Sequence, residues 1–354
     1  FLLEGGEHKR ERKLLMPPFH GERMRAYGEI IVETTLRHFQ AAATQDAVKT
    51  IDVAQAISLE VIIRAIFGVQ DTQGTEAFKE AVRGLTKAIN PVFFFASFTQ
   101  QPFFGIGPYD KFVRAYERLD NLLQKQITHS RARETPGEDI LSLLVQARYE
   151  DGAAMEDASI RDELRTLLFA GHESTALTIS WVIDLIHRTP GVLGRTLSEL
   201  DALGKTPTPE QIAAAPYLEA ACKEAMRLYP ITTEVPRQLQ KPIRLGNYSM
   251  PIGTAVSASI LLVHYREDLY PEPNAFKPER FLDRRYSAFE YMPFGGGMRR
   301  CIGAAFAMYE LKLVTATLLK HFNVDLLDSE APVPVRKNIT LSPKGGVPIR
   351  VRSP

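Results

Sequence analysis

Cysteine is scarce in this 354-residue chain, in which only Cys222 and Cys301 occur. Two cysteines cannot build a disulfide framework or a four-cysteine metal site, and they favour a reducing compartment. An excess of charge of one sign is also lacking, since 43 basic and 42 acidic residues leave a formal net charge of +1. This balance argues against bulk attraction to nucleic acid or to an anionic membrane.

Long uninterrupted hydrophobic runs are missing as well. The longest charge-free stretch, 88–109, has the length of a membrane span but is interrupted by Pro91, Pro102 and Pro108. We therefore reject a span and interpret its phenylalanine-rich part as packing under a loop, with an access lip as the alternative. The chain shows no secretory signal and starts without Met, as though inside a fold. We therefore expect an N-terminal portion to be missing.

Helical periodicity dominates the first two thirds of the chain, and β-type patterns follow it. Helices are expected at 23–40, 51–67, 76–89, 109–133, 140–148, 157–188 and 214–227, and from Cys301 to about 322. One hairpin is expected around Gly246 and Asn247, and a second is expected to turn at 344–346. Because no repeat or linker is visible, we predict a single domain over 1–354 that is mainly α with a small β-rich part.

The segment FGGGMRRCIG, residues 294–303, places Cys301 at or just before a helix N-terminus. The free N–H groups and the positive end of the helix dipole there favour a thiolate. The glycines at 295–297 allow a tight loop around the sulfur. A thiolate of this kind is a nucleophile or a metal ligand, and a structural cysteine is the alternative. No local pattern supplies a nucleophile's base or companion zinc ligands, whereas one thiolate suffices for haem iron.

The longest expected helix carries AGHEST at 170–175, in a stretch that is apolar almost all round. We expect this stretch to be interior, where burying Glu173 is costly without a partner or a purpose. Gly171 would allow close approach of a ligand or backbone. Glu173 with the hydroxyls of Ser174 and Thr175 is interpreted as a proton-delivery site. A kink with a hydroxyl bonded back to a carbonyl is the alternative.

Two smaller patterns bring charged side chains together. Glu224 and Arg227 in EAMR lie three residues apart among apolar neighbours, which indicates a buried pair that Arg280 can join. His8 and Arg12 share one helical face at i,i+4 spacing. A solvated basic helix and an anion-binding face are both compatible with that spacing.

Together these segments resemble the cytochrome P-450 family of haem-thiolate monooxygenases. FGGGMRRCIG fits the haem-binding pattern F-x-x-G-x-R-x-C-x-G at Phe294, Gly297, Arg299, Cys301 and Gly303. EAMR fits E-x-x-R, FKPERF fits the P-E-R-F stretch, AGHEST fits the acid–alcohol pattern, and HKRER fits H-x-x-x-R. All five occur in the family's order, so the chain is identified as a bacterial soluble-type member that lacks the N-terminal part of the fold. The resemblance implies the family fold, with the long central helix over the haem.

The resemblance implies a role for each matching residue. Cys301 would be the axial ligand of the iron of haem b, and Glu173, Ser174 and Thr175 would deliver protons, with Ser174 where the family usually has Thr. The side chains expected to pair with the haem propionates are His8, Arg12, Arg237 and Arg299. Glu224, Arg227 and Arg280 would form a structural ion triad. The expected substrate pocket is lined by Leu168, Phe169, Ala170, Ile231, Thr232, Val235, Leu341 and Ser342.

The implied reaction inserts one atom of O₂ into a C–H bond of an apolar small molecule such as a fatty acid, terpenoid or steroid. Two electrons would come from an external ferredoxin- or flavodoxin-type donor. We expect this donor, an acidic protein, to dock on the cations Lys277, Arg280, Arg284, Arg285, Arg299 and Arg300, for which a merely solvated face is the alternative. A peroxide-driven peroxygenase and a non-catalytic haem binder or sensor are the alternatives. A monomer in the bacterial cytoplasm is expected, with a membrane anchor in the missing N-terminal part as a further possibility.

Overall fold

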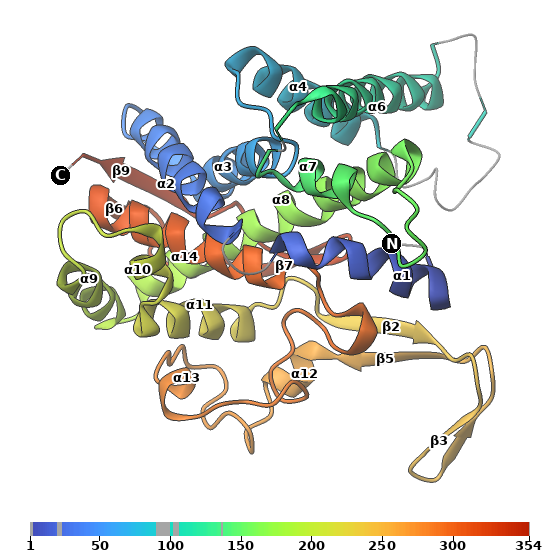
Figure 1. The fold of residues 1–354 in the computed structure, drawn as a ribbon. Helices are drawn as coiled ribbons and strands as arrows, with labels where there is room; N and C mark the ends of the chain where they lie inside the picture. Colours follow the sequence, from blue (N-terminus) through green and yellow to red (C-terminus); the bar gives the residue numbers. More distant parts are fainter. Residues whose placement is uncertain (1–2, 20–22, 90–99, 102–105, 136, 354) are drawn as a thin grey trace. The chain divides into compact units, whose positions relative to one another are not determined.

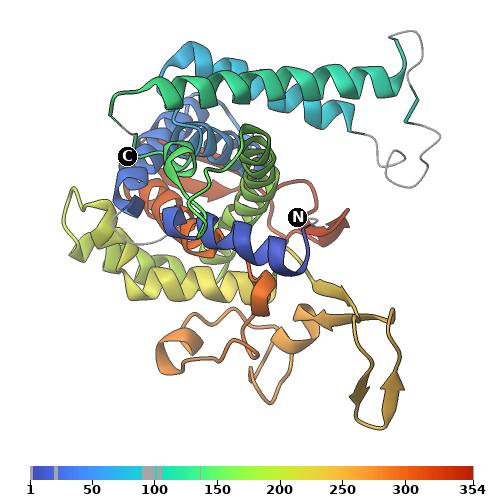
Figure 2. The same cartoon turned by 45° about the vertical axis from the view of Figure 1, so that its right-hand side comes forward.

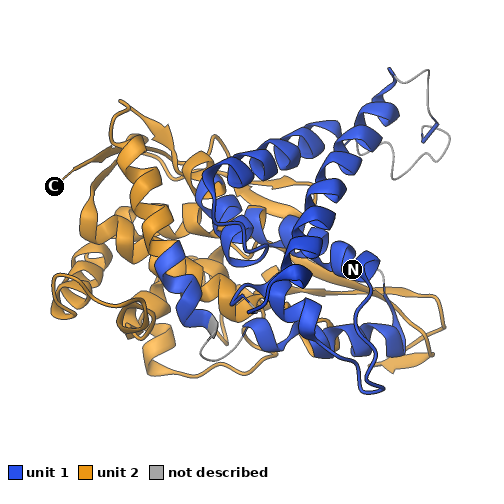
Figure 3. Cartoon of the chain, turned by 45° about the horizontal axis from the view of Figure 1, so that its top comes forward, with its two compact units in different colours: residues 1–30, 56–172 blue, residues 31–55, 173–354 orange. Residues whose placement is uncertain are grey.

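A computed structural model describes residues 3–19, 23–89, 100–101, 106–135 and 137–353 (Figure 1). The phenylalanine-rich segment considered as loop packing or as an access lip lies mostly outside these residues. The chain divides into two compact units, shown in Figure 3. Unit 1 comprises residues 1–30 and 56–172, and unit 2 comprises residues 31–55 and 173–354. The assignment of the whole chain to one domain stays a prediction.

Unit 1 is built from helices. Those within it are α1 (Gly5–Leu15), the 3₁₀ turn η1 (Pro17–Phe19), α4 (Thr72–Ala88), α6 (Pro108–Ala132) and α7 (Ile140–Gln146). α4 and α6 lie side by side in Figures 1 and 2. The apolar stripe of α6 recurs every four residues at Leu119, Leu123 and Ile127, all fully buried. Asp71 begins α4 by accepting a hydrogen bond from Gly74 N–H at 2.6 Å.

Three helices contain residues of both units: α2 (Arg23–Ala42), α3 (Thr50–Ala65) and α8 (Asp157–Arg188). The bounds of α8 are those predicted from the sequence. The burial expected at its centre is only partly observed. Residues 175–186 are buried, but Ala170 is exposed and residues 171–174 are half-buried. The composition of an apolar helix does not show which part of it is covered by other segments of the chain.

Unit 2 surrounds the long buried helix α14 (Ala304–His321). The other helical elements within it are α9 (Val192–Ala202), α10 (Pro209–Ala213), α11 (Pro216–Leu228), α12 (Ile260–His264), α13 (Arg280–Asp283) and the 3₁₀ turn η3 (Gly297–Arg299). α9, α10 and α11 all pack against α14. Because α14 is covered on most sides, its apolar residues run almost all round the helix.

The strands of unit 2 are short and antiparallel. They form one three-stranded sheet, in the order β1 (Val48–Lys49), β9 (Pro348–Arg352), β6 (Asn323–Leu326), and three pairs: β2 (Glu234–Gln238) with β5 (Ala255–Ser259), β3 (Ile243–Leu245) with β4 (Tyr248–Met250), and β7 (Pro334–Lys337) with β8 (Thr340–Pro343). The β3–β4 hairpin extends from the end of the β2–β5 ribbon in Figures 1 and 2. The prediction of a mainly α fold with a small β-rich part is confirmed.

One of the two predicted hairpin turns is correct. The turn at Gly246 and Asn247 joins β3 to β4 as expected. The second prediction was wrong, because the C-terminal hairpin turns at Asn338, which has a positive φ of 57°, while residues 344–346 only lead from β8 to β9. β9 pairs with β6 and β1 instead, and this buries Ile349 and Val351 on one face. Such long-range pairing is not visible in local turn residues.

Candidate active site

The loop that carries Cys301 lies directly ahead of α14 in unit 2. Cys301 N–H donates a hydrogen bond to the carbonyl of Phe294 at 2.9 Å, which closes the loop. Gly295 and Gly297 have φ values of +66° and +67°, a conformation that other residues adopt only with strain. Cys301 is exposed, and α14 begins three residues later at Ala304. The predicted placement of Cys301 just before a helix N-terminus is confirmed.

The surroundings of Cys301 fit a haem better than a metal ion held by the protein alone. No cluster of three or more His, Cys, Asp and Glu side chains able to hold a metal ion occurs in the part of the chain that the structure describes. A Cβ added at Gly296, Gly297 or Gly303 would meet no atom within 4 Å, so a planar group has room to approach the loop backbone. One accessible thiol on a glycine-rich loop is the donor set that haem iron requires of a thiolate site.

Beneath this loop the structure brings the three members of the predicted ion triad together. Glu224 accepts hydrogen bonds from Arg227 at 2.7 and 2.8 Å and from Arg280 Nε at 3.2 Å. The backbone N–H of Lys277 donates to the same carboxylate at 3.0 Å. Glu224 and Arg227 are fully buried, and a buried charge of this kind requires its partners. The Arg280 side chain is only 8% exposed, so it adds little to the surface cations of the predicted donor-docking face.

Three aromatic residues around the loop were missed by the sequence reasoning. His264 accepts a hydrogen bond from Met292 N–H through Nε2 at 3.0 Å. The hydroxyls of Tyr270 and Tyr291 donate to the carbonyls of Glu290 and Lys223, at 2.9 and 3.0 Å. Their only signal in the sequence is the density of aromatic residues between 264 and 291. No periodicity distinguishes them from ordinary core packing.

The acid–alcohol segment of α8 differs from expectation in its burial. The Glu173 side chain is 40% exposed, and its Oε1 lies 3.9 Å from Nζ of Lys337 on β7, so the expected burial of this acid was wrong. Ser174 is half-buried, and burial of the helix becomes complete only at Thr175. The expected close approach at Gly171 is observed, but it is made by a side chain of the protein. A Cβ there would stand 3.0 Å from Cδ1 of Ile62.

A chain of contacts within unit 2 links α8 to the Cys301 loop through the expected pocket segments. Trp181 Nε1 on α8 donates to the Leu341 carbonyl at 3.4 Å, and Leu341 N–H donates to the Ile231 carbonyl at 2.9 Å. Val235 follows on β2, and a Cβ on Gly295 would lie 3.6 Å from its Cγ1. Three of the residues predicted to line the substrate pocket therefore lie between the acid–alcohol helix and the cysteine loop.

Comparison with known proteins places these features in one family. The family model described as Cytochrome P450 matches residues 1–349. The chain belongs to the cytochrome P450 family. It is 32% identical to a putative cytochrome P450 138 of Mycobacterium tuberculosis over 98% of this chain and 76% of that protein. It is also 32% identical to a putative cytochrome P450 137 of the same species, over 99% of this chain and 72% of that protein.

Solved structures agree with this assignment. Retinoic acid-bound cyanobacterial CYP120A1 superposes with a TM-score of 0.84 at 25% identity, over 99% of this chain and 79% of that one. The haem domain of a cytochrome P450DA mutant has the same fold, with a TM-score of 0.83 at 21% identity over 98% and 77% of the two chains. As a cytochrome P450, the chain is a monooxygenase that binds haem b and receives electrons from an external partner.

The remaining predicted site residues of this cytochrome P450 lie on several elements. His8 and Arg12 are half-buried on α1 in unit 1. In unit 2, Arg299 is exposed in η3, and Arg237 on β2 is exposed and donates to the carbonyl of Pro236 at 2.8 Å. The other predicted pocket residues differ in burial: Leu168 and Ser342 are buried, Phe169 and Thr232 are half-buried, and Ala170 is exposed.

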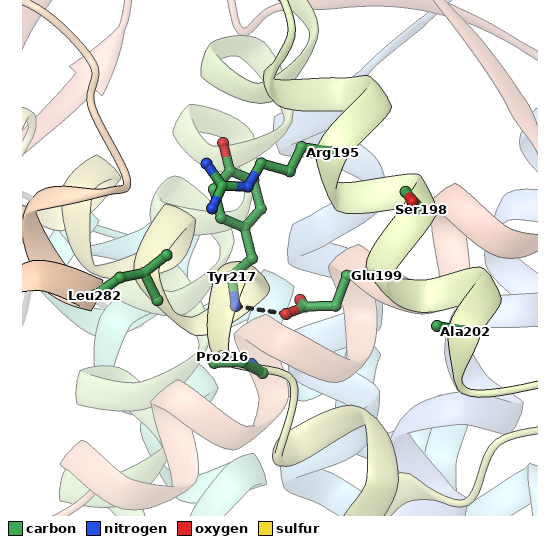
Figure 4. A pocket seen from close by; sticks show the side chains of 7 residues that line it. All are labelled: Arg195, Ser198, Glu199, Ala202, Pro216, Tyr217 and Leu282. Carbon is green, nitrogen blue, oxygen red and sulfur yellow. Dashed lines mark hydrogen bonds between the residues drawn. The ribbon is translucent and has the colours of Figure 1, made fainter.

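A surface pocket of about 410 Å³ lies on α9, α11 and α13 and contains none of the predicted site residues (Figure 4). Glu199 on its wall accepts hydrogen bonds from the N–H groups of Tyr217 and Leu218, at 2.7 and 2.8 Å. The guanidinium of Arg195 stacks on the Tyr217 ring and pairs with Glu279 at 2.7 Å. These contacts satisfy the free N–H groups at the start of α11. They indicate that the pocket arises from the packing of helices in this cytochrome P450.

In the part of this cytochrome P450 that the structure describes, no helix combines the length and the apolar character needed to cross a membrane.

Proposed function

We propose that Cys301 of this cytochrome P450 would hold the haem iron through its thiolate, and that the protein hydroxylates a C–H bond of an apolar small molecule. The observation that carries the proposal is the exposed Cys301 at the end of its closed glycine loop, directly ahead of α14. The balanced reaction consumes the substrate, O₂, two electrons and two protons, and forms the alcohol and water. The haem, when bound, supplies the activation of O₂.

The protein's own groups would control charge and protons. The Cys301 thiolate would hold the iron and supply it with electron density. Glu173 and Ser174, adjacent on α8, would take up protons at the carboxylate and release them through the Ser174 hydroxyl. His8, Arg12, Arg237 and Arg299 stay predictions as partners of the propionates.

The substrate class is inferred from the side chains between α8 and the loop. Ile231, Val235 and Leu341 are apolar, and all three are partly accessible. They favour a fatty acid, a terpenoid or a steroid-like molecule. Retinoic acid, which the solved structure of CYP120A1 holds, is a largely apolar terpenoid that ends in a carboxylic acid.

An acidic ferredoxin or flavodoxin is proposed as the electron donor. Arg284, Arg285, Arg299 and Arg300 are exposed between α13 and α14, together with Met298, which is 64% exposed. Arg284 pairs with Glu290, and Lys277 pairs with Glu272. Arg285 and Arg300 leave this exposed face cationic, which complements an acidic surface and would accelerate association.

The decisive experiment replaces Cys301, the proposed protein ligand of the haem iron. Cys301→Ser should abolish the thiolate-type spectrum of the reduced CO complex, while Cys222→Ala, at the buried cysteine, should keep it. Product should form with reductant, donor and O₂ but not with peroxide alone. A thiolate-type spectrum that survives Cys301→Ser would refute the role of Cys301. Efficient turnover with peroxide alone would instead favour a peroxide-driven peroxygenase.

A further inference from the structure

We propose that His264 is a positioning residue that holds the Cys301 loop in place through a neutral imidazole ring of fixed tautomer. His264 is the last residue of α12 and is fully buried. The proposal rests on the role of Cys301 given above. The His264 ring bonds the backbone of Met292 rather than the sulfur. Met292 lies just before the loop of residues 294–303 and is called the stem of the loop below.

The hydrogen bonds of the ring determine its tautomer. Met292 N–H donates to Nε2 at 3.0 Å, and because an amide nitrogen only donates, Nε2 carries no proton. The proton of the neutral ring is therefore on Nδ1, which donates to the carbonyl of Arg227 at 3.1 Å. The ring thus connects the end of α11 to the stem of the loop. Only this neutral tautomer makes both bonds.

The bond to Met292 is continued into the loop by backbone hydrogen bonds. The carbonyl of Met292 accepts from Gly295 N–H at 2.9 Å, and the carbonyl of Phe294 accepts from Cys301 N–H at 2.9 Å. Both peptide groups of Met292 are therefore engaged, one with His264 and one inside the loop. A shift of Met292 would be passed through these bonds to the backbone of Cys301.

The burial of His264 and the charge of Arg227 oppose protonation of the imidazole ring. Arg227 on α11 donates from Nη1 to the His264 carbonyl at 2.8 Å, with Glu224 behind it. The ring of Tyr291 stacks on the imidazole at 5.5 Å between centroids, and Tyr270 meets it edge-on at 6.3 Å. Burial lowers the pKa of His264 to about 4, and the Arg227 charge acts in the same direction.

Acid is expected to break the hydrogen bond between Met292 N–H and Nε2 of His264, because the ring becomes protonated when the pH falls to its lowered pKa. At neutral pH the ring is uncharged and accepts from Met292 N–H. When the pH falls towards 4, a proton on Nε2 would face the Met292 N–H, and two donors cannot bond. The loop should then lose its attachment, and the thiolate ligation should be lost with it.

The test compares three variants of the haem-loaded protein. His264→Phe keeps a ring for stacking but removes both nitrogens, and His264→Gln keeps one acceptor and one donor without a titrating ring. His187→Gln is the matched control, because His187 on α8 also has a pKa lowered by burial but bonds only the Ile183 carbonyl, at 2.7 Å. Two readouts are measured: the reduced CO spectrum from pH 7 down to 4, and amide hydrogen exchange of residues 290–303.

His264→Phe should weaken the thiolate-type spectrum at pH 7 and speed exchange in the loop by about tenfold, because it removes the buried hydrogen bond that holds Met292 N–H. His264→Gln should keep the spectrum at pH 7 and move its acid loss to lower pH. His187→Gln should behave as wild type. An acid profile of His264→Gln that superposes on wild type, or unchanged loop exchange in His264→Phe, would overturn the positioning role. Hydrogen exchange reports whether the loop is held in place and does not presuppose that Cys301 is the ligand, so this failure is distinct from a failure of Cys301→Ser.

Discussion

Arg227 and His264 exchange two hydrogen bonds, 37 residues apart in the chain. The guanidinium of Arg227 donates to the His264 carbonyl at 2.8 Å, and the His264 ring donates to the Arg227 carbonyl at 3.1 Å. Each residue also makes a further hydrogen bond: Arg227 donates to Glu224 on the same helix, and the His264 ring accepts from Met292 N–H. The ion triad and the cysteine loop are therefore parts of one buried polar network. Networks of this kind rigidify a site when every member is satisfied.

Disruption of the triad should destabilise the protein strongly. Glu224→Gln removes the charge that balances two buried guanidinium groups, and we expect a loss of about 3–5 kcal/mol in the free energy of unfolding. Glu279→Gln, which breaks the exposed pair with Arg195, should cost no more than about 1 kcal/mol. Denaturant unfolding of both variants measures the difference. Equal effects of the two substitutions would contradict the triad's structural importance.

Stability should fall as the pH drops below about 6.5. The pKa of His264 is lowered from 6.5 to about 4, so the unfolded chain binds a proton that the folded chain resists over this interval. The contribution is present in full above pH 6.5 and is lost as the pH falls through 4. About 3 kcal/mol follows from a shift of this size. Unfolding free energies of wild type and His264→Gln from pH 7 to 4 should diverge accordingly, and parallel curves would count against this account.

Proton delivery through Ser174 should be less tightly controlled than it would be through threonine. A serine hydroxyl lacks the methyl group that restricts rotamers, so we expect Ser174→Thr to lower the peroxide formed per electron consumed. Ser174→Ala should raise it. Thr175→Val, at the neighbouring buried hydroxyl, should change it little. Coupling is measured as the ratio of peroxide to product. A larger effect of the Thr175 substitution than of the Ser174 substitutions would contradict the assignment of the proton relay to Ser174.

The donor-docking face should be sensitive to salt. Arg285→Glu and Arg300→Glu place acids on an exposed cationic surface, and reduction of the haem by an acidic donor should slow by about tenfold at low ionic strength. Arg244→Glu on β3 serves as the exposed control and should leave the rate unchanged. Stopped-flow reduction at increasing salt provides the measurement. A rate of haem reduction that changes neither with salt nor with the two substitutions would exclude docking at this face.

The two cysteines should differ sharply in reactivity. Cys222 is fully buried on α11, and burial raises its pKa to about 12, so almost none is thiolate at neutral pH. Cys301 is exposed. A thiol reagent applied to haem-depleted folded protein should therefore label Cys301, with Cys222 labelled only after denaturation. Peptide mass spectrometry identifies the labelled site, and rapid labelling of Cys222 in the folded protein would show that α11 opens.

Local sequence determined the elements of this protein whose signals are periodic or carried by a motif. The bounds of α8, the hairpin at Gly246 and the position of Cys301 before α14 follow from residues close together in the chain. Side-chain periodicity and glycine conformation act over a few residues, so they can be recognised without a fold.

Tertiary structure decided the features that depend on distant neighbours. Only packing shows that Glu173 is half-exposed, that β9 pairs with β6 rather than β8, and that His264 bonds the stem of the cysteine loop. Burial and the pairing of polar groups are set by which segments meet in space. That meeting reflects the total free energy of the packed chain, which no local window of sequence contains.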